Sequence, residues 1–328
     1  MSNKWLILIV FYFVCQFCIA QQDSLYVKNY KHIYGVKLYL ANDNLSFEYE
    51  LQEKDSEKFL PNKPINIGVG FSWKNSSLSY SYGFSFLRDK KKGKTKSRDL
   101  QYHYYGERMV IDLYYQRYKG FYLEGDKNKP YNLFNSLSIN YYGISGQYIF
   151  NNKRYSAAAA FDQSKKQVKS AGSLLLGGGL FYNKIKNLPE VREKLKDYDR
   201  VSYNFGPNIG YGYNWVPLKN LLLAGSFSVG INGVFDKNLE SNETTFRVNP
   251  QVTGRFSVMY QSEDWIIGVS SLVNNLYVSF KDDYQSSILN TNLTLTVIKR
   301  FTPKKEWRLL KYDFTDLLKK REEEENIK

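Results

Sequence analysis

Few residues in this sequence have the chemistry of a catalytic site. It contains two histidines, His32 and His103. A hydrolase or acyltransferase of the serine type needs a histidine beside a serine and a polar group that orients it. His103 lies between two tyrosines with no serine two residues on. A hydrogen-bonded structural role is therefore the favoured interpretation of His103, and a lipid-modifying enzyme is the minor alternative.

Motifs for metals and phosphates are missing from the sequence. There is no HExxH, no glycine-rich loop followed by Lys and Ser or Thr, and no calcium-loop spacing of acids. Gly177-Gly178-Gly179 resembles a phosphate loop only superficially, because glycines within a strand also leave room for a bend or for neighbouring chains. We therefore expect no catalytic residue, no metal site and no cofactor.

The most concentrated charged feature is a basic cluster between residues 88 and 98. A run of cations attracts anionic surfaces, so it is a weak candidate for binding lipopolysaccharide phosphates or anionic lipid. The alternative is a solvated hairpin tip. The cluster comprises Arg88, Lys90, Lys91, Lys92, Lys94, Lys96 and Arg98.

Residues 1–20 have the pattern of a secretory signal peptide. Lys4 precedes an apolar run from Trp5 to Val14, and the segment ends with a small residue at Ala20, where we expect cleavage. The run is too short for a membrane-spanning helix. Both cysteines lie inside this segment, so the mature chain cannot form disulfides or use thiol chemistry.

The net charge bears on possible partners. The 46 basic residues less Lys4, against 32 acidic residues, leave a formal charge of +13. Such an excess of basic residues often indicates a protein that binds nucleic acid. A secreted chain instead meets the phosphates of lipopolysaccharide and anionic lipid. We therefore expect no nucleic-acid partner.

Composition narrows the fold class. Aromatic residues make up 17% of 328 residues, with 29 tyrosines, while the mean hydropathy is −0.49. A bundle of transmembrane helices would raise the hydropathy, and a disordered chain would contain few aromatics. Strands with one apolar and one polar face fit both values.

Alternation of apolar and polar residues is clear in several long segments. From Pro64 to Lys74, and again from Arg200 to Asn214, aromatic and aliphatic residues alternate with Ser, Gly and Asn. Such segments exceed the five or six residues of an ordinary strand and match the length that crosses a bilayer at a tilt. Alternation leaves open whether the apolar face meets lipid or fills a soluble core.

Tryptophan positions favour the membrane interpretation. Trp73, Trp215 and Trp265 each lie on the apolar face within a few residues of a short turn. Aromatic belts at a bilayer surface have this arrangement. The alternative is that these residues cap the core of a soluble barrel.

The sequence predicts an all-β, up-and-down antiparallel transmembrane barrel of about 12 strands (10–14). It would comprise an N-terminal segment at 21–43 with a possible extra strand, a barrel at 44–302 and a periplasmic amphipathic helix within 303–328. If the short turns are periplasmic, the long loops and the basic cluster lie outside the cell. Candidate strands are 45–51, 64–74, 78–86, 100–118, 137–150, 155–162, 172–182, 200–214, 221–235, 244–260, 265–280 and 288–301. The segment 100–125 is long enough to hold two strands, and 32–41 is a candidate for an additional one.

Several short motifs resemble a family of uncharacterised Bacteroidetes outer-membrane proteins, domain of unknown function 4421. The resemblance implies an envelope β-barrel and assigns no activity or site residues. The motifs are Phe59–Asn62, Ile67–Ser72, Asp112–Gln116, Tyr118–Tyr122, Tyr148–Asn151, Gln167–Ser173 and Gly177-Gly178.

The function expected from these features is that of a non-enzymatic barrel in the outer membrane of a Gram-negative bacterium. It would be a small-solute channel or a structural envelope component. The alternative is a binding protein for lipopolysaccharide, glycan or a partner protein. Insertion would need the barrel-assembly machinery. The interior face is mostly small and polar, so either a narrow passage exists or the N-terminal segment or tail fills the lumen.

Overall fold

The computed structural model describes residues 22–51, 56–63, 65–73, 76–84, 88–123, 130–188, 199–280 and 284–303. The signal peptide expected at residues 1–20 and nearly all of the helical tail expected at 303–328 lie outside these residues. The elements are β1 (Val27–Asn29), β2 (Tyr34–Leu51), β3 (Ser56–Leu60), β4 (Asn66–Trp73), β5 (Ser76–Gly83), η2 (Lys90–Lys92), β6 (Lys96–Tyr105), β7 (Met109–Leu123), β8 (Asn132–Ile149), η3 (Ala158–Asp162), β9 (Lys165–Gln167), β10 (Ala171–Lys186), β11 (Arg200–Leu218), β12 (Leu221–Asn238), β13 (Thr244–Gln261), β14 (Trp265–Phe280) and β15 (Tyr284–Phe301).

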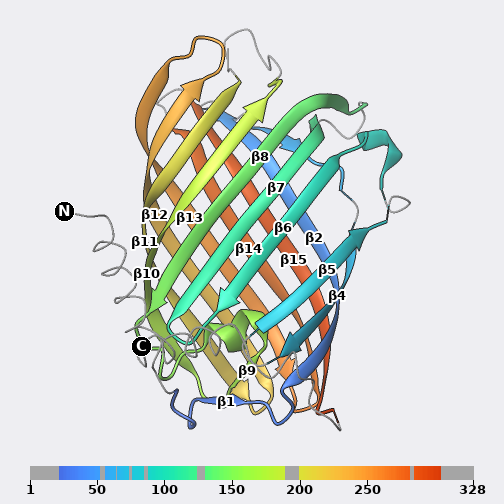
Figure 1. Ribbon diagram of the computed structural model, residues 1–328, viewed down its shortest axis with the longest axis vertical. Helices are drawn as coiled ribbons and strands as arrows, with labels where there is room; N and C mark the ends of the chain where they lie inside the picture. The colour runs from blue at the N-terminus through green and yellow to red at the C-terminus, as the bar shows by residue number, and fades with distance from the viewer. Residues whose placement is uncertain are drawn as a thin grey trace, which may run out of the picture.

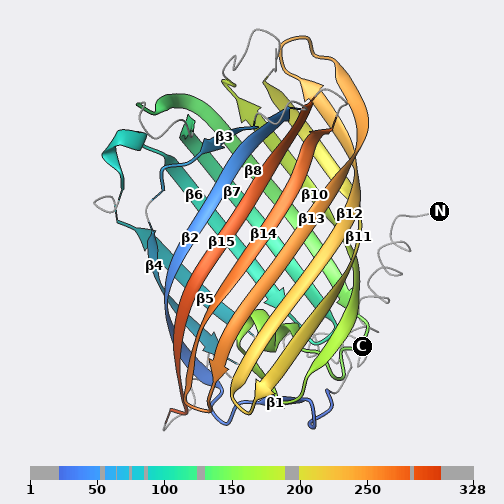
Figure 2. The same ribbon diagram turned by 180° about the vertical axis from the view of Figure 1, so that it is seen from behind.

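The long strands form a closed antiparallel barrel (Figures 1 and 2). Each strand from β7 to β15, with β9 left out, pairs with its neighbours in chain order, and β15 pairs with β2 along its full length. Near one end, β3 connects β2 to β7 and completes a ring of ten strands. Three further strands, β4, β5 and β6, extend the wall toward the other end. The predicted up-and-down barrel is confirmed.

Some predicted strand boundaries were wrong. The first barrel strand, β2, begins at Tyr34 rather than at residue 44, and it joins two stretches that the sequence pattern separates. The alternative that residues 100–125 hold two strands is confirmed: β6 ends at Tyr105, the Gly106 amide bonds the Met109 carbonyl at 2.9 Å in a tight turn, and β7 begins at Met109. Residues 155–162 are not a strand. Four successive alanines interrupt the alternation there and form the helical turn η3.

Over most of the wall the apolar face points outward, whereas near the loop end some apolar residues of β2 and β8, such as Leu45 and Leu137, point into the lumen. On β12, Phe227 is 57% exposed and Val229 is 45% exposed, whereas Ser228 between them is 2% exposed. The same pattern holds on β11, where Tyr211 and Tyr213 point out. The aromatic and aliphatic residues therefore lie on the outside of the wall, which resolves the question that alternation left open.

The two ends of the barrel differ in their connections. One end, here the short-turn end, holds the tight connections at 106–108, 219–220 and 262–264, together with the end of β15. The other, the loop end, holds the longer connections such as 187–199 and 239–243. Figure 1 shows β1 below the short-turn end. This is the separation of short turns from long loops that the sequence predicts.

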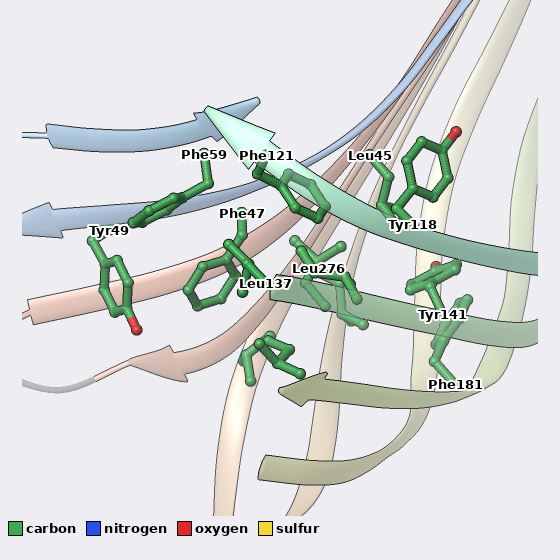
Figure 3. Close-up of a cluster of buried hydrophobic side chains, with 14 of the residues drawn as sticks. Leu45, Phe47, Tyr49, Phe59, Tyr118, Phe121, Leu137, Tyr141, Phe181 and Leu276 are labelled. Atoms are coloured by element: carbon green, nitrogen blue, oxygen red, sulfur yellow. The ribbon is translucent and has the colours of Figure 1, made fainter. Parts of the chain in front are cut away.

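Side chains fill the lumen near the loop end. A buried cluster of aromatic and aliphatic residues from β2, β3, β7, β8, β10, β14 and β15 meets inside the barrel (Figure 3). Phe47 and Phe59 have ring centroids 6.4 Å apart and Leu137 is fully buried. We call this group the apolar cluster: Leu45, Phe47, Tyr49, Phe59, Tyr114, Tyr118, Phe121, Leu137, Ile139, Tyr141, Phe181, Ile185, Leu276, Val278 and Ile288.

A plug segment, residues 151–170, fills the lumen near the short-turn end. Its backbone is bonded by wall side chains: Ser257 Oγ donates to the Ala160 carbonyl at 2.7 Å, and Gln261 Nε2 donates to the Ala159 carbonyl at 3.1 Å. Strand β9 of the plug pairs with β1, so the N-terminal segment covers the plug from outside. The sequence left open a narrow passage or a lumen filled by the N-terminal segment or the tail. The connection between β8 and β10 fills this end of the lumen, and Tyr30 of the N-terminal segment packs against Ala159 and Ala160. The tail lies outside the described residues.

An ion pair ties the plug to a turn of the wall. Glu263 lies 3.1 Å from Lys166 Nζ and accepts a hydrogen bond from the Lys31 amide at 3.1 Å. Partial burial would raise the pKa of Glu263, but the Lys31 amide and the Lys166 ammonium lower it below its ordinary value. The carboxylate therefore remains charged and holds the plug and the N-terminal segment at this turn.

Gly120 has a conformation that a side chain would strain. Its φ is +89°, and a Cβ added there would lie 2.5 Å from the Lys94 carbonyl oxygen. We expect Gly120→Ala to lower the free energy of unfolding by about 1–3 kcal/mol, because backbone and contact are both unfavourable. Urea titration of the vesicle-inserted protein measures this value. Gly254→Ala is the control, since an added Cβ there meets nothing within 4 Å; equal losses in the two variants would contradict the prediction.

Candidate functional site: a cavity in the barrel wall

A cavity of about 910 Å³ lies where β5 and β6 run beside each other in the wall. Strands β2, β5 and β6 contribute most of its lining, and β13, β14, β15 and η3 contribute from across the lumen. Within the described residues, β5 pairs only with β4 and β6 pairs only with β7. The two strands therefore face each other with unpaired edges (Figure 1). The volume of the cavity is within the range of small-molecule binding sites.

The cavity passes through the wall. On β6, Leu100 and Tyr102 point outward, whereas Gln101 and His103 alternate with them and face the lumen, yet all four line the same cavity. Successive residues of a strand point to opposite faces. One cavity can contact both faces only by extending around a free strand edge. The cavity is therefore an opening between the lumen and the outside of the barrel.

One side of the cavity is organised by Lys63. Its Nζ lies 3.3 Å from Asp99 Oδ2 and 3.8 Å from Asp43 Oδ2. Asp99 also accepts hydrogen bonds from Tyr118 Oη at 2.6 Å and from Gln116 Nε2 at 3.1 Å. All these groups are largely buried. A buried cation between two carboxylates with additional donors is rigid, because each charged group has its hydrogen bonds satisfied.

A second network crosses the lumen behind the cavity. His103 Nδ1 lies 2.7 Å from Asp112 Oδ1, and Arg255 Nη2 of β13 bonds Asp112 Oδ2. Arg255 Nη1 continues to Gln147 at 3.3 Å, and Gln147 Nε2 donates to Ser228 Oγ at 2.8 Å. Asp112 is 3% exposed as a side chain. The network connects β6 and β7 to the opposite wall and closes the middle of the lumen.

The geometry around His103 is not that of a serine hydrolase. Ser145 donates to Asp112 at 3.3 Å rather than to the histidine. Among the described residues, His103 bonds Asp112 and no hydroxyl group. A nucleophile must lie within hydrogen-bond reach of its base. His103 therefore lines the cavity as an oriented imidazole without a nucleophile beside it.

Three cations of the cavity have no hydrogen-bond or ion-pair partner among the described residues. They are Lys37, Arg88 and Arg98. Lys37 Nζ lies 5.2 Å from the centre of the Tyr39 ring. Arg88 Nε is buried without a partner. The other two cavity cations are paired, Lys63 with Asp43 and Asp99 and Arg255 with Asp112. With Asp162, which also lines the cavity, five cations face four carboxylates, which leaves one positive charge in excess.

The structure divides the predicted basic cluster into two parts. Arg88 and Arg98 line the cavity. Four of the lysines lie on the loop between β5 and β6, where Lys92 Nζ is 5.1 Å from the centre of the Tyr122 ring, and Lys96 begins β6. The loop is held by Asn62, whose side chain donates to the Asp89 and Gly93 carbonyls at 2.6 Å. Binding of lipopolysaccharide by Lys90, Lys91, Lys92, Lys94 and Lys96 stays a prediction.

The three predicted belt tryptophans lie at the short-turn end. Trp73 pairs with Tyr34 at the start of β2, Trp215 is near the end of β11 and Trp265 begins β14. Trp215 and Trp265 point outward, and Lys299 Nζ lies 4.7 Å from the centre of the Trp265 ring. This placement fits a bilayer surface, but the belt itself stays a prediction.

Two further features of the described residues can be stated. No helix there has the length and apolar character needed to cross a bilayer. No group of three His, Cys, Asp or Glu side chains in those residues is arranged to hold a metal ion.

A closed antiparallel barrel with an apolar outer face has the architecture of the transmembrane β-barrels. The sequence profile described as "Domain of unknown function (DUF4421)" matches residues 21–301. The chain therefore belongs to the DUF4421 family, as the short motifs predict. No curated protein matches it.

Solved structures with a similar fold are distant. The outer-membrane protease OmpT from Escherichia coli has a TM-score of 0.38 and 8% identity, covering 82% of this chain and 96% of that chain. A bacterial polysaccharide outer membrane secretin has a TM-score of 0.35 and 9% identity, with coverage of 83% and 99%. The toluene transporter TodX of P. putida has a TM-score of 0.26 and 7% identity, with coverage of 82% and 90%. Likenesses at this level say nothing of activity or ligand.

Proposed function

We propose that this protein is a non-conducting, non-enzymatic barrel of the outer membrane that binds a ligand in its wall cavity. The observation that carries the proposal is the contrast between lumen and wall. The lumen is filled by the apolar cluster and by the plug segment, whereas the wall opens between β5 and β6. A filled lumen favours the binding alternative over the small-solute channel.

The membrane location is supported by the outer face. Large apolar side chains are exposed on strands around the barrel, including Leu38, Ile209 and Leu293. A soluble protein rarely exposes so continuous an apolar surface. The signal peptide expected at residues 1–20 directs the chain out of the cytoplasm. With the short turns in the periplasm, the basic loop lies on the cell surface, and the chain would depend on the barrel-assembly machinery for insertion.

Conductance of the purified protein in planar lipid bilayers tests the closed lumen. We expect no stable ohmic steps, because the apolar cluster and the plug block the path at two levels. Flotation with vesicles and heat-modifiable migration in gels must first show that the barrel is folded and inserted. Reproducible conductance steps from inserted, unmodified protein would show an open passage and would contradict the proposal.

A further inference from the structure

The opening between β5 and β6 lies at the level of the apolar outer surface. Strand β5 extends the wall beside the short-turn half of β2, because it pairs with β4, which pairs with Tyr34–Ala41. Around the opening, Tyr80 is 68% exposed, Tyr82 is 59% exposed and Leu100 is 65% exposed, all toward the outside. The mouth of the cavity therefore meets the surface that we assign to lipid.

Unpaired strand edges are costly in hydrocarbon. Backbone N–H and C=O groups that face lipid find no water to bond, so open sheet edges occur there only where they border protein or a polar cavity. The facing edges of β5 and β6 satisfy this condition because polar groups of the cavity lie between them. The condition also requires that polar atoms of a ligand or water remain in the opening.

The lining of the cavity has the two halves of an amphiphile site. Tyr80, Tyr82 and Leu100 form an apolar mouth, and the interior contains Ser81, Gln101 and His103. Charge in the interior is mostly compensated by the pairs of Lys63 and Arg255. Inside the cavity, Lys37 is near the carboxylate of Asp162. Arg98 is exposed on the same outward row of β6 as Leu100, so it lies at the mouth. Arg88 also lines the cavity and has no ion-pair partner among the described residues. An occupant with an acyl chain and an anionic head would complement both halves.

Resting on the proposed ligand-binding function, we infer that the cavity binds an anionic amphiphile, an acyl chain joined to a phosphate or carboxylate head, which enters from the bilayer between β5 and β6. The chain lies against the apolar residues of the mouth, and Arg88 and Arg98 hold the head at its edge. Entry through the wall follows from the fold, because the apolar cluster and the plug close the two routes along the barrel axis.

Three probes test this inference on the mature protein in phosphatidylcholine nanodiscs, with empty nanodiscs as the reference in titration calorimetry. Dodecyl phosphate has the anionic head and the chain, dodecyl maltoside has the chain with a neutral head, and inorganic phosphate has the head alone. We expect saturable binding of dodecyl phosphate and at least tenfold weaker binding of the other two.

Two variants test the head-group contacts. In Arg88→Gln with Arg98→Gln, binding of dodecyl phosphate should weaken about 30-fold, because each cation beside an anionic head contributes about fivefold. The matched control is Lys186→Gln with Lys237→Gln, two exposed lysines of the wall that do not line the cavity. That control should change binding less than about twofold at 0.15 M salt, where exposed charges are screened. Equal weakening in both variants would show that charge acts only from a distance, and would overturn the assigned contacts.

The outcomes separate this inference from the function on which it rests. If inorganic phosphate binds as tightly as dodecyl phosphate, the chain has no role and the inference is wrong, while ligand binding stands. If dodecyl maltoside binds equally well, the anionic head has no role, and the inference is again wrong. If none of the three probes binds to folded, inserted protein, the ligand-binding function falls together with the inference.

Discussion

Replacing Arg255 by Leu is expected to lower the free energy of unfolding by about 3–5 kcal/mol. Arg255 is the cation that bonds Asp112, whose side chain is 3% exposed. Without it, the carboxylate would remain buried in the lumen with only His103 and Ser145 as partners. Urea titration of the vesicle-inserted barrel, followed by tryptophan fluorescence and gel migration, measures the loss.

The double variant Arg255→Leu with Asp112→Asn is the control for this effect. Asparagine keeps an acceptor for Ser145 and removes the charge, so the double variant should be clearly more stable than Arg255→Leu alone. If the single and double variants unfold at the same urea concentration, the unpaired charge is not the cause. The loss would then come from the packing of the guanidinium alone.

The face of each strand was predictable because the side-chain period of a strand is two. The alternation from Arg200 to Asn214 places Tyr203 and Tyr211 on one face and Asn204 on the other, as the structure has them. Alternation does not show which strands pair with each other. The missing pairing between β5 and β6 and the ten-strand ring depend on contacts between distant segments.

The plug segment contains a local sequence signal for a helical turn. Ala157–Ala160 interrupts the alternation, and alanine is the best helix former. Small side chains also allow the helical turn to fit inside the barrel, where Ala159 and Ala160 are fully buried. The strand predicted at 155–162 was therefore wrong, and the run of alanines is the reason. The sequence does not show that the helical turn lies within the lumen.

The candidate site was only partly predictable. Arg88 and Arg98 were identified as part of a basic run, but nothing in the run separates them from the lysines between them. Their separation depends on the tertiary structure: Asn62 holds the loop at the Asp89 and Gly93 carbonyls, and Arg98 lies within β6 beside the cavity. The partner of His103 follows from strand register, since the hairpin places His103 opposite Asp112.

Replacing Val229 by Arg is expected to lower the free energy of unfolding by about 2–4 kcal/mol in lipid vesicles. Val229 lies near the middle of β12, opposite Ile209 and Val252, and points outward with 45% of its surface exposed. If the outer face meets hydrocarbon, a guanidinium at this depth must be brought out of water. The same urea titration measures the change.

Leu218→Arg is the matched control at a different depth. Leu218 also points outward, with 66% exposure, but it ends β11 beside the turn at residues 219–220. The cost of a cation falls to about 0–1 kcal/mol near the membrane surface. In a barrel whose outer face met water, both substitutions would change stability by less than about 0.5 kcal/mol, because exposed positions tolerate charge. A large loss at Val229 with a small one at Leu218 is therefore specific to a bilayer around the barrel, and two small losses would contradict the membrane location.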